Sequence, residues 1–308
     1  MAWMLDMEIK RELPEEWKGI VPTEVFLREA KTIVGEAEKR GLTLRILGGL
    51  GVAMHCQEFR DFATRLGRTG TGVMEGQEYS DIDFMSYRRH REEIKELFRE
   101  MGYAKRRATL SSAASERQIY YHPKGWFYVD VFYDKLLVAN HPLDFKGRLE
   151  LDYPTIPVTD LLLEKIQIWE AFSVKDLKDC LVLLKSHEIK EGGEKEGIDA
   201  SYIAKLLARD WGFWYTATTN LKKIRKFVSE MDDLGAEAEI DPKRFRKEDR
   251  GEITEKIEKL IGRIDSEPKS LKWKVRSKAG TKKRWYNHVE RPDTVGGFGI
   301  WEVILPKE

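Results

Sequence analysis

The sequence predicts an α+β protein, in which a mixed sheet with flanking helices is followed by a mostly helical region. In the first half, short apolar or alternating runs typical of strands stand between amphipathic segments of helical periodicity. After Pro157 the apolar residues recur almost only at helical spacing. Because 308 residues are enough for two domains, we expect a first domain over residues 1–155 and a helical region over residues 156–308.

The elements of the first half follow from periodicity and from the residues that interrupt it. Residues 23–40 carry apolar side chains at helical spacing and stop at Gly41, which predicts a helix. The glycine-rich residues 67–77 predict a surface loop. The other predicted elements are a strand over Leu42–Leu47, a helical stretch over residues 50–66, a strand over Asp81–Ser86, a helix from His90 to Met101, and strands near Gln118–Tyr121 and Trp126–Tyr133.

The second half is predicted to be helical. Residues 158–172 and 174–187 both have helical periodicity, and Thr159 is the expected N-cap of the first helix. A polar linker broken by glycines follows over residues 188–198. Further helical stretches are predicted near residues 199–234 and 247–265, and a basic aromatic tail occupies residues 269–291.

Composition excludes several classes of protein. Cys56 and Cys180 are the only cysteines, too few for a disulfide scaffold or a cysteine-rich zinc site. His55, His90 and His141 lack metal-ligand spacing, and we expect His141 to be a structural histidine. No run of about 18 apolar residues predicts a membrane-spanning helix, and the first residues lack the apolar core of a signal peptide. A cytoplasmic protein without a membrane partner is therefore expected.

Basic residues gather toward the end of the chain. Residues 241–291 hold 17 Lys and Arg against 9 Asp and Glu, a local charge of +8 in a chain of net charge +1. Within the tail, Lys282, Lys283 and Arg284 precede Trp285. Because basic side chains contact phosphates and aromatic rings stack on unpaired bases, these four residues are candidates for RNA contact. The alternative is a solvated basic helix whose tryptophans pack on the domain.

Three aspartates carry the strongest chemical interpretation. Asp81 and Asp83 lie two residues apart on a predicted strand, so both side chains project from the same face. Crowded carboxylates repel each other and are usually paired with cations, and hard oxygen ligands suit Mg²⁺. Asp130 lies in an apolar predicted strand, where an unpaired charge is costly to bury. If the two strands are neighbours, the three acids can bind two metal ions.

Gly48 and Gly49 stand where a predicted strand ends and a helix begins. Without a Cβ, glycines at this point allow backbone N–H groups and the helix N-terminus to approach a phosphate. Each short motif also has an ordinary alternative. The glycine pair can be a simple turn, and Asp81 with Asp83 can be a surface pair.

Taken in order, the motifs LRILGGLGVA, YSDIDF and YVDVF resemble the nucleotidyltransferase superfamily, which has a polymerase-β-like fold. The resemblance implies Asp81 and Asp83 as metal ligands. It implies that Asp130 completes the metal site and assists deprotonation of an acceptor hydroxyl. The cofactors implied are two Mg²⁺ ions, with Mn²⁺ as the alternative, and the substrate implied is an NTP.

The same resemblance implies nucleotide contacts from Gly48 and Gly49, and from Ser80 before the aspartate pair. One feature departs from the family pattern. The interval from Gly48 to Asp81 is longer than in the minimal members, and the glycine-rich segment fills it.

The segment TDLLLEKIQIWEAFSVKDLKDCLVLL resembles the corresponding part of AbiE-type toxins and related nucleotidyltransferases. This resemblance implies that Lys165 reaches the triphosphate and that Asp176 and Asp179 orient it or brace the helix. On one continuous helix the three residues would share a face. The alternative is a set of solvated charges on an exposed helix face. The whole chain also resembles bacterial and archaeal proteins known only as nucleotidyltransferases.

The expected function is Mg²⁺-dependent transfer of a nucleoside monophosphate from an NTP to a hydroxyl, with the helical region closing the nucleotide cleft. The acceptor stays open between RNA such as tRNA, a protein hydroxyl and a small molecule, and the basic tail favours RNA. Two alternatives are a non-catalytic nucleotide- or RNA-binding module and the toxin of a toxin–antitoxin pair. The preferred NTP and the oligomeric state do not follow from the sequence.

Overall fold

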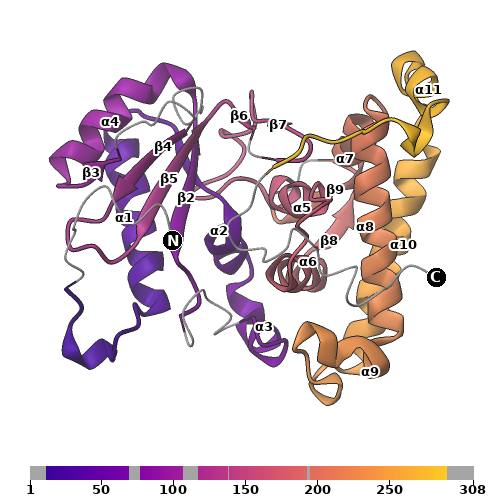
Figure 1. Cartoon of the computed structure of the whole chain (residues 1–308), viewed down its shortest axis with the longest axis horizontal. Coiled ribbons are helices and arrows are strands. Elements are labelled where there is room, and N and C mark those ends of the chain that lie inside the picture. Colours follow the sequence, from indigo (N-terminus) through magenta and orange to yellow (C-terminus); the bar gives the residue numbers. More distant parts are fainter. Residues whose placement is uncertain (1–11, 69–76, 107–116, 138, 193–194, 290–308) are drawn as a thin grey trace. The chain divides into compact units, whose positions relative to one another are not determined.

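The computed structural model confirms an α+β fold with a mixed sheet. It describes residues 12–68, 77–106, 117–137, 139–192 and 195–289 (Figure 1). Most of the predicted glycine-rich loop, residues 69–76, lies outside the described residues. The described residues form two compact units. The first unit consists of the described residues up to 51, from 77 to 135 and from 145 to 156. The second unit consists of the described residues from 52 to 68, from 136 to 144 and from 157 to 289.

The first unit is built on a five-stranded sheet in the order β1-β2-β5-β4-β3. The strands are β1 (Leu44–Ile46), β2 (Asp81–Ser86), β3 (Ala104–Lys105), β4 (Arg117–Tyr121) and β5 (Tyr128–Tyr133). Strands β2 and β5 run parallel, whereas β1 is antiparallel to β2 and β4 is antiparallel to β5. In the parallel pair, residues in register, such as Asp83 and Asp130, lie side by side on the same face of the sheet.

Helices α1 (Thr23–Lys39) and α4 (Arg91–Glu100) contact each other and cover one face of this sheet (Figure 1). Phe84 of β2 and Tyr120 of β4 are buried there against Phe98 of α4, whose ring stacks on Tyr120 at 4.2 Å. Because side chains alternate along a strand, Asp81 and Asp83 point away from this core. The opposite face of the sheet thus carries the acidic residues.

The second unit is mostly helical. Its elements are α3 (Arg60–Arg65), α5 (Val158–Ile166), α6 (Val174–Ser186), β8 (Glu188–Lys190), β9 (Gly197–Asp199), α7 (Ala200–Leu207), α8 (Trp211–Ser229), α9 (Met231–Leu234), α10 (Lys247–Ser266) and α11 (Leu271–Ser277). Helices α8 and α10 lie side by side (Figure 1). Helix α2 (Gly48–His55) contains the division between the units, and β6 (Lys135–Leu136) pairs with β7 (Leu143–Asp144).

The predicted element bounds need four corrections. Helix α5 starts after Pro157, and Thr159 lies inside it instead of capping it. The predicted helix over residues 158–172 ends at Ile166, and α6 begins after Ser173, whose hydroxyl accepts from the Asp176 N–H in a capping box. The predicted linker holds the parallel strands β8 and β9. The predicted helix over residues 50–66 is divided into α2, a 3₁₀ turn and α3.

None of the helices in the described part of the chain is both long and apolar enough to cross a membrane.

The basic tail packs on α8 of the second unit. The ring of Trp273 lies 5.0 Å from that of Trp214. The ring of Trp285 lies 4.9 Å from Trp169 and 5.0 Å from Tyr215, all distances being between ring centroids. These spacings are those of favourable aromatic pairs. The contacts of both tail tryptophans therefore match the packing alternative.

Two further contacts hold Trp285 in place. Its indole Nε1 donates to the hydroxyl oxygen of Thr216 at 3.1 Å. A Cβ at Gly212, in the first turn of α8, would meet the Trp285 carbonyl oxygen at 2.4 Å, so only glycine allows this approach. The tail lies directly on the backbone of α8.

We predict that Trp285→Ala lowers the free energy of unfolding by about 2–4 kcal/mol, because a large ring leaves a packed cluster. Urea denaturation followed by tryptophan fluorescence and circular dichroism measures the change. Lys283→Ala is the matched control: its exposed side chain should contribute less than about 0.5 kcal/mol. Equal losses in the two variants would contradict the packing role of Trp285.

Candidate functional site

The parallel pairing of β2 and β5 brings the three predicted aspartates together. Asp83 stands directly beside Asp130 in the register, and Asp81 lies two residues earlier on the same face of β2. One carboxylate oxygen from each residue lies within 4.8 Å of the other two. A divalent cation placed among them could take a ligand from all three.

The surroundings of Asp130 fit a cation. Its Oδ2 accepts from Nη1 of Arg117 at 3.1 Å, whereas its Oδ1 is buried without a hydrogen-bond partner. Burial raises the pKa of Asp130 to about 6; Arg117 opposes this rise and Asp81 adds to it. A buried carboxylate oxygen that lacks a donor is costly. Three hard oxygen ligands with one unsatisfied atom are a suitable set for Mg²⁺.

Gly48 is held against this acidic group. Its backbone has a positive φ of 67°, and a Cβ at this position would lie 2.8 Å from Oδ2 of Asp83. The preceding residue, Leu47, donates its N–H to the Asp83 carbonyl oxygen at 3.0 Å. Both the conformation and the close approach require glycine. The long interval between Gly48 and the aspartates therefore does not separate them in space.

The other predicted nucleotide contacts of the first unit lie next to these residues in the chain. Gly49 is the second residue of α2, and the Ser80 hydroxyl donates to Oδ1 of Asp81 at 3.0 Å. Ser80 thus orients one of the candidate metal ligands. A direct contact of Gly49 or Ser80 with a nucleotide stays a prediction.

Lys165 and its expected partners form a buried ionic cluster in the second unit. Nζ of Lys165, near the end of α5, lies 3.4 Å from Asp176 and 3.2 Å from Asp179, both on α6. Glu164 lies at 3.6 Å from the same nitrogen, and Nε of Arg68 lies 2.5 Å from Asp179. The cluster therefore joins α5, α6 and the segment that holds Arg68.

Two expectations about this group, the single continuous helix and the solvated-charge alternative, need correction. The residues do not share one continuous helix, because α5 and α6 are separate helices that pack together. Nor are they solvated charges, since Lys165, Asp176 and Asp179 are all buried. Burial lowers the pKa of Lys165, but Asp179, Glu164 and Asp176 together raise it above its ordinary value, so the ammonium stays charged. A contact of Lys165 or Asp176 with a triphosphate stays a prediction.

The four candidates for RNA contact differ in exposure. Lys282, Lys283 and Arg284 are exposed on the second unit, whereas Trp285 is half-buried in the aromatic cluster. The three basic residues are available to a polyanion, and Trp285 is already engaged in packing.

His141 has the structural role that the sequence predicts. Its Nε2 lies 2.8 Å from the Thr216 hydroxyl, and its ring stacks on Phe213 at 5.1 Å. Burial lowers the pKa of His141 to about 4, so the imidazole is neutral at pH 7.

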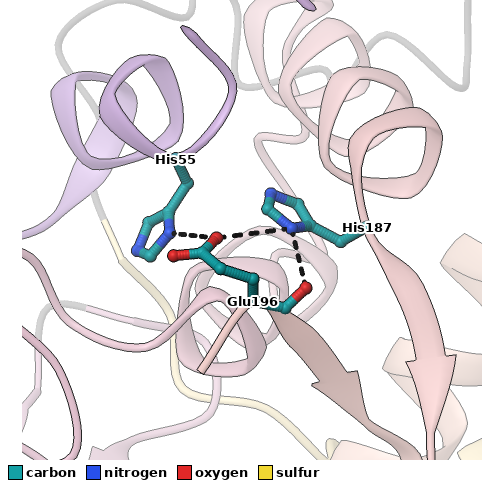
Figure 2. A group of neighbouring side chains, drawn as sticks. All are labelled: His55, His187 and Glu196. Carbon is teal, nitrogen blue, oxygen red and sulfur yellow. Dashed lines mark hydrogen bonds and ion pairs between the residues drawn. The ribbon is translucent and has the colours of Figure 1, made fainter. Parts of the chain in front are cut away.

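A second group of possible metal ligands was not expected from the sequence. His55, at the end of α2, and His187, after α6, meet Glu196 before β9, and all three belong to the second unit (Figure 2). Burial is the main cause that lowers the pKa of His187. No spacing signal could identify the group, because His55 lies far from the other two in the chain and only tertiary packing unites them.

Comparison with known proteins gives no match: no family model, curated protein or solved structure matches the chain. What each site can do therefore follows from its geometry and chemistry.

We predict that, without divalent ions, Asp130→Asn unfolds at a higher temperature than the wild type at pH 7.5. Because the pKa of Asp130 is raised from its ordinary value of 3.8 to about 6 in the folded state, the charged carboxylate opposes folding. The wild type therefore loses stability as the pH rises from 3.8 to about 6. The advantage of the variant should therefore shrink as the pH falls through about 6.

Thermal unfolding in EDTA from pH 4 to 8 measures this difference. Asp233→Asn, at an exposed position on α9, is the control and should follow the wild type at every pH. A constant difference between Asp130→Asn and the wild type across this range would contradict a buried, protonatable Asp130.

Proposed function

We propose that this protein is a Mg²⁺-dependent nucleotidyltransferase of the polymerase-β-like class, moving a nucleoside monophosphate from an NTP to a hydroxyl acceptor. The observation that carries the proposal is the convergence of Asp81, Asp83 and Asp130 across the parallel β2–β5 pair. The contact between Gly48 and Asp83 supports it, because it joins the glycine turn before α2 to the acidic strand. Each motif alone is weak support for this function, and stronger support comes from their proximity in the first unit.

The chemistry assigns a role to each carboxylate. Mg²⁺ ions held by the aspartates would neutralise phosphate charge and favour ionisation of the acceptor hydroxyl. Asp130 takes the hydroxyl proton as the acceptor oxygen bonds to the α-phosphorus. The bond from the α-phosphorus to the bridging oxygen breaks, and pyrophosphate leaves. Positioning and charge neutralisation supply most of the rate acceleration in such a reaction.

The beginning of α2 supplies the nucleotide contact in this proposal. Gly48 and Gly49 open the helix, and because neither has a Cβ, a phosphate can approach the helix start closely. The positive end of the helix dipole favours a phosphate bound there. Ser80 contributes indirectly by holding Asp81 through its hydroxyl.

We predict that Asp81→Asn and Asp83→Asn each lower Mg²⁺-dependent NTP turnover by at least about 100-fold, because each removes charge that stabilises the transition state. Gly48→Ala should also lower turnover, since its Cβ would lie 2.8 Å from Asp83 Oδ2. Pyrophosphate release is measured with each NTP, Mg²⁺, total RNA and cell lysate.

The control for these variants is Asp61→Asn, which makes the same chemical change at an exposed position on α3. It should retain wild-type turnover. Undiminished turnover in Asp81→Asn would refute the assignment. A wild type that binds NTP tightly and transfers nothing to any acceptor would instead indicate the non-catalytic binding module.

RNA is the acceptor that we propose, because of the exposed basic residues of the tail. Lys282, Lys283 and Arg284 extend over three consecutive exposed positions. Binding to a polyanion releases counterions in proportion to the phosphates contacted, which gives this proposal a direct measurement.

We predict that neutralising Lys282, Lys283 and Arg284 together weakens tRNA binding and reduces the salt slope, log K against log salt, by about 2–3, since each phosphate contact contributes roughly 0.7–0.9. NTP binding should not change. A salt titration of wild type and variant measures both effects. Lys222, Lys226 and Lys259, which are exposed on α8 and α10, provide a triple substitution of the same charge as control. Absence of RNA binding by the wild type at low salt would exclude this acceptor.

A further inference from the structure

The side chains of His55, His187 and Glu196 form a ligand set typical of a transition metal. We propose that these three residues bind one divalent transition-metal ion, with Zn²⁺ the best fit, at a site distinct from the three aspartates. The proposal is independent of the nucleotidyltransferase function, because it rests on different residues and a different ion. Figure 2 shows the two imidazole rings on either side of the glutamate carboxylate.

The distances suit tetrahedral coordination. Oε2 of Glu196 lies 3.2 Å from Nδ1 of His55 and 3.7 Å from Nδ1 of His187. A tetrahedral Zn²⁺ with bonds of about 2.0–2.1 Å keeps its ligand atoms about 3.3–3.4 Å apart. Each of the three residues offers one ligand atom within 4.8 Å of the others. The two separations from Oε2 of Glu196 are therefore within a few tenths of an ångström of the tetrahedral value.

The burial of the ligands indicates a site that is fixed on one side and open on the other. The His55 and His187 side chains are each only 4% exposed, whereas the Glu196 side chain is 65% exposed. Two imidazoles held by packing lose little conformational freedom on binding. The exposed carboxylate admits the ion from solvent and leaves a fourth position for water, as in zinc sites with three protein ligands.

Coordination through Nδ1 of His187 exchanges one hydrogen bond for the ion, because this nitrogen lies 3.1 Å from the Glu196 carbonyl oxygen, to which it can only donate. When Nδ1 binds the ion, the ring proton resides on Nε2, which lies 3.6 Å from Sγ of Cys56. Partners on the second ring nitrogen fix the tautomer and orientation of histidine ligands in metal sites.

The local charge balance also admits a cation. Lys256, whose charge acts on His187, is paired with Glu188 at 2.9 Å and Glu252 at 2.7 Å. Its positive charge is thus compensated by carboxylates on the neighbouring elements.

The ligand chemistry distinguishes this ion from the one proposed for the aspartates. Imidazole nitrogens suit Zn²⁺, Co²⁺ and Ni²⁺, whereas Mg²⁺ requires oxygen ligands. In the fold the ion would join the end of α2, the end of α6 and the approach to β9. Because an ion that binds only the folded state stabilises it, metal binding should be visible in the unfolding temperature.

The test uses the full chain, freed of any polyhistidine tag and stripped with EDTA. We expect calorimetry to give one Zn²⁺ per chain, Co²⁺ to give the visible bands of a tetrahedral site, and Zn²⁺ to raise the unfolding temperature. Glu196→Gln keeps the shape of an exposed side chain and should lower the affinity for Zn²⁺ at least roughly 10-fold. His55→Ala should have an equal or larger effect.

Two controls make the result specific. His288→Ala removes an exposed histidine whose Nδ1 lies 2.7 Å from Glu170, and it should bind Zn²⁺ like the wild type. The Asp81→Asn, Asp83→Asn double variant should also retain the zinc site even if it loses NTP turnover. The proposal is overturned if the wild type binds no stoichiometric Zn²⁺, or if Glu196→Gln and His55→Ala both bind it with wild-type affinity.

Discussion

The positions of the acidic residues and of the α2 start in the first unit depend on the parallel pairing of β2 with β5. It places Asp83 beside Asp130 and leaves a carboxylate oxygen of Asp130 buried without a donor. Hydrophobic packing of Ile82 and Phe84 on the opposite face holds the strands in this register. A slip of the register by one residue would turn the aspartates into the core. Because burying a charge is costly, the slipped register is disfavoured. The acidic face is thus maintained by the apolar one.

The same constraint extends to the turn before α2. Leu47 donates to the carbonyl oxygen of Asp83, and Gly48 then turns with a positive φ against the Asp83 side chain. The main chain of β2 therefore determines where α2 begins. A side chain at Gly48 would have to displace either the helix start or the carboxylate. Gly48 and Asp83 lie far apart in the sequence, yet the position of each restricts that of the other.

How far the sequence predicts the structure depends on the range of the interactions involved. The bounds of β2 could be predicted because alternation of Ile82 and Phe84 with the two aspartates is a local pattern. The predicted linker after α6 is wrong because strands of three residues, β8 and β9, are too short to show a period and are stabilised by pairing with each other. His55, His187 and Glu196 meet only through tertiary packing, which residue spacing in the sequence does not reveal.

The contact of Gly212 with Trp285 has a consequence for the order in which the chain folds during synthesis. The main chain of Trp285 lies on α8, more than seventy residues after Gly212, and its ring completes a cluster with Trp169 and Tyr215. During synthesis on the ribosome, α8 emerges well before this partner. Until the tail arrives, one side of the aromatic cluster faces water, and exposed apolar rings of this kind favour association with other nascent chains. Only after Trp285 has emerged from the ribosome can the nascent second unit cover this side of the aromatic cluster.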